Sequence, residues 1–305
     1  MNTPQIVVGI DGSRAAERAM LWAAEEAGRR GARLLIAHAG DVDSNAGTAG
    51  PTDYARALMV DAQTAVDDSG IGCEVATFLD DEEPVRLLSR LSRQAQLVVV
   101  GSHGVGRLAG AFLGKAAYRV ATHAHCPVAL VPAAWEPAGA AQPVVVGVSA
   151  TPAASSALDY AFAEAELRGV PLTAVRSWCR ADWSPASPTA LYESGDRFEN
   201  RQAERAQLIL RPFLDAHPSV EVATVVTGEP IEDALLSAAR EADQLIVGCR
   251  SRSGRRQSRL GWTTSRLMHE SPCPVIVIGP PSSTSVTTTQ LSAVGSPAPA
   301  SGRER

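Results

Sequence analysis

The sequence predicts an α/β protein built from two tandem doubly wound domains. Each domain is expected to hold a five-stranded parallel sheet, in strand order 3-2-1-4-5, with helices on both faces. The first observation behind this prediction is that short runs of Val, Ile, Leu and Ala alternate with longer helical segments. Runs that are apolar throughout are typical of strands buried on both faces, and right-handed crossovers between them give a parallel sheet.

The second observation is an internal repeat. Residues 6–13 (IVVGIDGS) match residues 144–151 (VVVGVSAT), and the CPV triplet at 126–128 recurs at 273–275. Each copy has the size of one ordinary domain. We therefore predict a first domain over 1–135, a linker over 136–142, a second domain over 143–280, and a disordered Ser/Thr/Pro-rich tail over 281–305.

The apolar runs place the strands in order, and capping residues place the helices. Ser13 and Thr151 stand where helix N-caps belong, and Pro84, Pro152 and Pro230 suit first helical turns. The acidic run at 80–83 is interpreted as carboxylates near the positive end of a helix dipole. Strands are predicted near 5–10, 33–39, 73–78, 96–100, 127–131, 143–148, 171–177, 220–226, 244–248 and 274–278.

A glycine-rich turn follows the fourth predicted strand. Gly101, Gly104 and Gly114 are spaced Gly-x2-Gly-x9-Gly, and a helix is predicted to follow from about residue 116. Such a turn and the helix N-terminus after it suit a phosphate, although a structural loop is the alternative. A P-loop is excluded because Ala109 and Ala116 replace its first glycine and its hydroxyl, and the Gly-x-Gly-x-x-Gly spacing also fails.

Composition narrows the class of protein. The net charge of −5 and the pI near 5.7 argue against a general nucleic-acid binder, and no apolar segment is long enough to span a membrane. The N-terminus shows no signal peptide, and five cysteines without a CxxC pair predict a cytoplasmic protein. No metal ligands are predicted, because His123, His125 and Cys126 lack a fourth partner.

Residues 4–280 resemble a tandem universal stress protein of the ATP-binding branch. The resemblance is carried by the first strand ending in Asp11-Gly-Ser, the second ending in His38-Ala39, and the Gly101/Gly104/Gly114 loop with its helix and His-Cys-Pro-Val sequence. It implies that ATP binds the first domain with Mg²⁺. The implied site comprises Asp11 (ribose or metal side), Ala39 (adenine), and Gly101, His103, Gly104 and Gly114 (phosphate and ribose). The predicted site also includes Gly9, together with Lys115 and Ala116, whose N–H groups face an anion at the helix start.

Physical reasoning adds two expectations about this site. Gly101 and Gly104 are expected to permit positive φ and a close approach of the backbone to the ligand. Lys115 departs from the family, which usually has Ser or Thr there. A lysine can neutralise phosphate charge as a mobile cation, whereas the alternative is a solvated residue at the helix start.

The second copy departs further from the pattern. Ser149 replaces the aspartate, Ser251 replaces the second loop glycine, and Trp262 occupies the position of Lys115. We therefore expect no nucleotide in the same mode there. The same loop carries Arg250, Arg252, Arg255, Arg256 and Arg259, which predict either a solvated loop or a site for an anion or an acidic protein partner.

The resemblance predicts a nucleotide-binding regulator of the stress response. The two lobes are expected to pack as an internal dimer, and the chain to form a homo-oligomer. The alternatives are a slow ATP hydrolase or phosphotransferase, with His103 and Asp11 as the nearby candidates for its chemistry, and an interaction scaffold without a ligand.

Overall fold

The structure is a computed structural model that describes residues 4–40, 53–102, 114–137, 141–178, 195–249 and 260–279; the side chains of 195–198 are not described. His103, Gly104, the arginines at 250–259 and the predicted tail at 281–305 lie outside these ranges. Within them, ten strands and eight α-helices alternate along the chain, as the sequence predicted.

The first lobe follows the predicted order of elements closely. Its strands are β1 (Gln5–Gly9), β2 (Arg33–Ala39), β3 (Val75–Asp80), β4 (Leu97–Gly101) and β5 (Val128–Val131). Its helices are α1 (Arg14–Arg30), α2 (Asp53–Asp68), α3 (Pro84–Leu91) and α4 (Lys115–His123). The edge strand β3 begins two residues later than predicted, because the backbone N–H of Cys73 donates to Ile71 in a turn.

The second lobe repeats this order. Its strands are β6 (Val144–Gly147), β7 (Leu172–Ser177), β8 (Val222–Thr227), β9 (Gln244–Gly248) and β10 (Val275–Ile278). Its helices are α5 (Pro152–Arg168), α6 (Gly195–Ala216), α7 (Ile231–Ala238) and α8 (Trp262–Glu270), with a short 3₁₀ helix, η1 (Ala239–Glu241).

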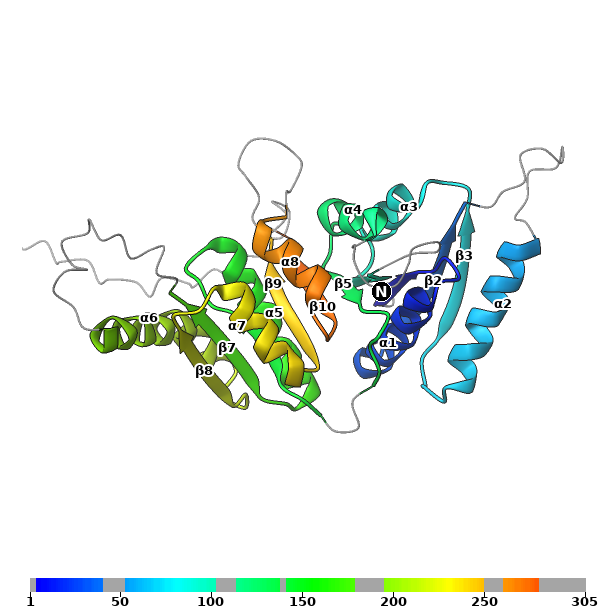
Figure 1. Cartoon of the computed structure of the whole chain (residues 1–305). Coiled ribbons are helices and arrows are strands. Elements are labelled where there is room, and N and C mark those ends of the chain that lie inside the picture. The colour runs from blue at the N-terminus through cyan, green and yellow to red at the C-terminus, as the bar shows by residue number, and fades with distance from the viewer. Residues whose placement is uncertain are drawn as a thin grey trace, which may run out of the picture.

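All ten strands form one sheet, in the order β3-β2-β1-β4-β5-β10-β9-β6-β7-β8. Each half has the predicted order 3-2-1-4-5 and is parallel throughout. The halves meet where β5 pairs with β10 in the antiparallel sense, with Ala129 opposite Ile276. The lobes are therefore joined edge to edge by a pseudo-two-fold relationship, and the sheet runs continuously through the middle of the molecule in Figure 1.

Two apolar layers cover the sheet. Alternate residues of β1 point to opposite faces: Ile6 and Val8 belong to the core layer that holds residues of α1, α2, α5 and α6, whereas Val7 belongs to the layer that holds residues of α3, α4, α7 and α8. Because the central strands of a doubly wound sheet are covered on both faces, their residues are apolar without alternation, whereas the edge strand β8 is partly exposed. This arrangement brings both lobes' third and fourth helices to the same side of the sheet.

The helix starts confirm most of the capping predictions. The Oγ of Ser13 accepts the N–H of Ala16, and Thr151 caps α5 in the same way. Glu83 caps α3 through its carboxylate, which explains part of the acidic run. Pro230 is the N-cap of α7 rather than a first-turn residue, since its ψ of 136° is not helical.

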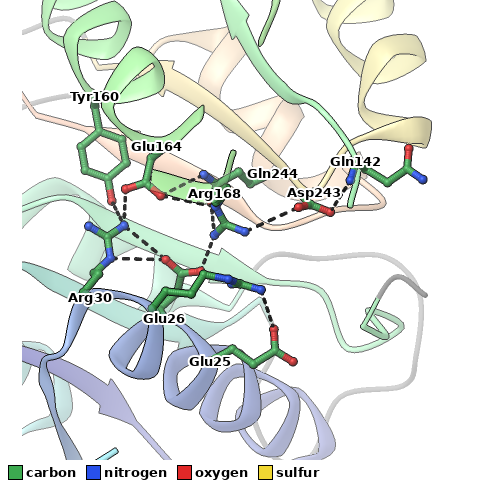
Figure 2. A network of polar contacts seen from close by, with 10 residues as sticks. Glu25, Glu26, Arg30, Gln142, Tyr160, Glu164, Arg168, Asp243 and Gln244 are labelled. Carbon is green, nitrogen blue, oxygen red and sulfur yellow. Dashed lines mark hydrogen bonds and ion pairs between the residues drawn. The ribbon is translucent and has the colours of Figure 1, made fainter. Parts of the chain in front are cut away.

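A buried charge network joins α1 to α5 across the lobe interface (Figure 2). Arg30 pairs with Glu164, and Arg168 pairs with Glu26. Within its own helix, each arginine also contacts the glutamate four residues earlier. Gln244 accepts a hydrogen bond from Arg168 and donates one to Glu164, which satisfies the remaining polar groups at the centre.

Candidate functional site

A cavity of about 150 Å³ lies at the carboxyl ends of β1, β2 and β4, beneath α3 and α4. In an open parallel sheet this is the edge at which ligands bind, where the strand order reverses. The cavity wall is apolar, with Leu87, Leu88 and Val120 among its side chains. Its lining includes six residues of the predicted site: Gly9, Asp11, Ala39, Gly101, Gly114 and Ala116.

The described residues enclose only part of a ligand site. A volume of about 150 Å³ is below the roughly 300–1,000 Å³ that is common for small-molecule pockets. The predicted contacts His103 and Gly104 lie outside the described residues, so the structure does not place them. Lys115 is exposed at the start of α4 and is not part of the cavity lining.

A larger cavity, of about 610 Å³, lies near the linker and is lined by α1 and by residues just before β6, β9 and β10 of the second lobe. Its charged side chains are largely paired with one another: Glu25 contacts Arg29, and Asp243 contacts both Arg168 and the backbone N–H of Gln142. Because these groups already have partners, and because the strands that reach this cavity do so with their amino ends, the smaller cavity is the better candidate for a ligand site.

Gly101 is required for a reason that differs from the prediction. Its φ is not in the left-handed region, so the expectation of positive φ was wrong. A Cβ at this position would instead lie 2.6 Å from the carbonyl carbon of Ala15 in the first turn of α1. Gly248 meets Ala153 in the same way in the second lobe. The glycine at the end of the fourth strand therefore lets the first helix approach the sheet.

The corner after β1 directs Asp11 towards the cavity. Its carboxylate accepts the backbone N–H of Ser13 at 3.0 Å, and the turn passes through Gly12, whose φ is 79°. The N–H of Ile10 donates to the carbonyl of Ala37 at 2.9 Å, which continues the sheet by one residue. The backbone around Asp11 is therefore fixed by the sheet before it and by the start of α1 after it.

His38 is a functional candidate to which the sequence analysis gave no role. Its Nδ1 lies 2.8 Å from the carbonyl oxygen of Ile10, and the side chain is only 5% exposed. Since a carbonyl oxygen can only accept, Nδ1 carries the proton in this contact. The signal in the sequence was a polar residue inside an otherwise apolar strand, directly before the predicted adenine contact Ala39.

The start of α4 presents backbone donors at the cavity. Gly114 is the N-cap, and its own N–H donates to the carbonyl of Ser102 at 2.9 Å. No side chain caps this helix within the described residues. The N–H groups of Lys115, Ala116 and Ala117 belong to the first turn, which has no acceptor within its own helix. An anion at this point would meet both these donors and the positive end of the helix dipole.

The second lobe keeps the architecture of the site and changes its chemistry. Ser149 stands at the position of Asp11, and its Oγ lies 3.1 Å from Oγ1 of Thr151. Ser177 stands at the position of Ala39 and donates a hydrogen bond to the carbonyl of Glu229. Trp262, the counterpart of Lys115, is 78% exposed. These polar contacts within the crevice replace the apolar and acidic lining of the first lobe.

Comparison with known proteins agrees with this geometry. The sequence profile of the universal stress protein family matches residues 3–132 and 141–279. The chain belongs to the universal stress protein family. Both lobes are thus universal stress protein domains, in keeping with the repeat and with the shared strand order.

Curated members of the universal stress protein family are similar along almost the whole chain. One from Mycolicibacterium smegmatis is 31% identical over 291 residues, covering 90% of this chain and 97% of its own. One from Mycobacterium tuberculosis is 29% identical over 299 residues, covering 89% and 94%. A crystal structure from Archaeoglobus fulgidus matches with a TM-score of 0.61 at 15% identity, covering 92% and 100%, and supports the fold.

Proposed function

We propose that the chain is a nucleotide-binding regulatory protein that takes one adenine nucleotide, ATP with Mg²⁺, in its first lobe. The observation that carries the proposal is the cavity lining: six residues predicted from the sequence surround one cavity at the carboxyl edge of the sheet. The apolar part suits a base, and the N-terminus of α4 suits a phosphate.

The lining favours binding over turnover. Asp11 is the single ionisable side chain among the described residues that line the cavity. Hydrolysis or phosphotransfer needs a residue that orients water or an acceptor, together with groups that stabilise the transferred phosphate. We therefore propose a regulator rather than an enzyme, and we place it in the cytoplasm. Among the described residues, no helix has the length and apolar character of a membrane span.

The test is calorimetric titration of the full chain with ATP and Mg²⁺, together with mass spectrometry of any nucleotide released from freshly purified, heat-denatured protein. We expect one site per chain and no measurable hydrolysis. Two equivalent sites, or no binding at all, would contradict the proposal.

A matched pair of variants locates the site. Ala116→Glu places a carboxylate in the first turn of α4, where it favours the helix but repels phosphate. We expect it to abolish ATP binding without lowering the melting temperature, whereas Ala116→Ser should bind normally. Gly104→Val should also abolish binding. Normal ATP affinity in Ala116→Glu would place the ligand elsewhere.

Two further expectations remain predictions. The arginines at 250–259 lie outside the described residues, so their acidic partner rests on the sequence alone. We likewise propose that the chain forms a homo-oligomer. A triple Arg252/Arg255/Arg256→Ala variant should weaken both polyanion binding and self-association at low salt if the loop is a docking site.

A further inference from the structure

The two lobes hold the end of their first strand in the same way, with different side chains. In the first lobe, Nδ1 of His38 donates to the carbonyl of Ile10 at 2.8 Å. In the second, Nη1 of Arg176 donates to the carbonyl of Val148 at 3.4 Å. His38 and Arg176 occupy the same position of the repeat, at the carboxyl end of β2 and β7.

The carbonyl in each case belongs to the residue just before the position of the site acid. Asp11 follows Ile10, and Ser149 follows Val148. The N–H of Ile10 donates to the carbonyl of Ala37 and so fixes the Gly9–Ile10 peptide unit, whereas the imidazole fixes the next unit, which joins Ile10 to Asp11. Because the direction of Asp11 depends on that peptide plane, His38 acts on the cavity through the backbone of Ile10.

The hydrogen bond between His38 and Ile10 is buried, so water cannot easily replace the imidazole as the donor. His38 is 5% exposed on the α1–α2 side of the sheet, whereas Ala37 and Ala39 line the cavity on the other side. Arg176, which is longer, needs additional support: its Nε and Nη2 both donate to Oε1 of the buried Gln202, at 3.0 and 2.8 Å. The shorter of the two contacts, from His38 to Ile10, is in the first lobe, where Asp11 lines the cavity.

We infer that His38 is a positioning residue of the nucleotide site, which holds the carbonyl of Ile10 and thereby sets the direction of Asp11. This inference rests on the proposed function of the first lobe. His38 does not line the cavity, so its effect on a ligand would be indirect.

Two variants separate positioning from packing. In His38→Asn, the side-chain amide nitrogen can take the place of Nδ1, but the lost ring volume leaves a gap in the core. In His38→Leu, the volume is better filled but the donor is gone, and the carbonyl of Ile10 loses its partner. A purely structural role would make nucleotide affinity follow stability in both.

The experiment is calorimetric titration with AMP and with ATP–Mg²⁺, alongside melting temperatures, for the natural chain and both variants. We expect His38→Leu to weaken binding roughly five- to tenfold, as the loss of one hydrogen bond implies, and His38→Asn to stay within about twofold although it melts earlier. The counterpart Arg176→Leu should leave the affinity unchanged.

The outcomes are distinguishable. If the natural chain binds nucleotide and His38→Leu binds it equally well, the inference is overturned and the proposed function stands. The same holds if the affinities of the variants simply follow their melting temperatures. Absence of binding by the natural chain would overturn the proposed function, and this inference with it.

Discussion

Arg30 of the first lobe forms an ion pair with Glu164 of the second, and the reciprocal pair joins Arg168 to Glu26. The two glutamates occupy the same position of the repeat, as do the two arginines. Glu26 is fully buried and Glu164 nearly so. Each helix therefore supplies one carboxylate and one guanidinium to the contact between α1 and α5. The charges are complementary about the pseudo-two-fold axis.

Breaking this network should destabilise the whole chain. Glu164→Gln keeps the side-chain shape but leaves the charges of Arg30 and Arg168 incompletely paired in the core. Removing one partner of a buried pair lowers the free energy of unfolding by about 3–5 kcal/mol, and we expect a loss of that size in urea unfolding followed by circular dichroism. Glu74→Gln is the control, because the Glu74–Arg33 pair is exposed and long at 3.7 Å. Equal effects of the two changes would contradict the role of the network.

Gly101→Ala tests the close approach of α1 to β4. The new Cβ would lie 2.6 Å from the backbone of Ala15, so the helix must shift. We expect a loss of about 1–3 kcal/mol in the free energy of unfolding, as for other overpacked cores. Gly72→Ala is the matched control, since a Cβ there meets no atom within 4 Å. A neutral Gly101→Ala variant would show that α1 can move freely.

Lys115 should contribute a charge-dependent contact to the phosphates of ATP. Lys115→Ala is expected to weaken ATP binding roughly tenfold or more and AMP binding much less, because a charge-assisted contact acts on the outer phosphates. Calorimetric titration with both nucleotides measures the difference. Equal losses would show that Lys115 acts through folding.

The same residue offers an independent measurement, since Lys115 is the only lysine of the chain. An amine-reactive ester should therefore label one side chain and the N-terminal amine. We expect ATP to protect Lys115 but not the N-terminus, as followed by peptide mass spectrometry. If saturating ATP does not slow the labelling of Lys115, the proposed contact with the phosphates is contradicted.

Cys273 should be unreactive in the folded chain. Burial raises the pKa of its thiol to about 11, and the side chain is 4% exposed. Because the thiolate is the reactive form, the thiol stays protonated and inert at pH 8. We expect peptide mapping after brief iodoacetamide treatment to find Cys273 unmodified in the native chain and alkylated in guanidinium. Rapid native alkylation would show that this end of β10 opens readily.

Much of the fold could be predicted because its signals are local. The apolar runs and the capping residues Ser13 and Thr151 predicted the strands and the helix starts, and the alternation of the two predicted the doubly wound fold class. The glycine spacing predicted a phosphate-binding turn, and the family resemblance supplied the individual site residues. These features depend on neighbours in sequence, so a single chain displays them.

The remaining features depend on contacts between distant segments. The antiparallel pairing of β5 with β10 and the crossed pairs of Glu26 and Glu164 arise only when the lobes meet. The reason for Gly101 lies in Ala15, and the hydrogen-bond partner of His38 is the carbonyl of Ile10, 28 residues earlier in the chain. The sequence by itself determined which segments form strands and helices, and it predicted a site at the carboxyl ends of the strands. Only the tertiary structure decided which side chains contact one another around the carboxyl ends of the strands. Two partners that are distant in sequence produce no local periodicity or spacing from which their contact could be predicted.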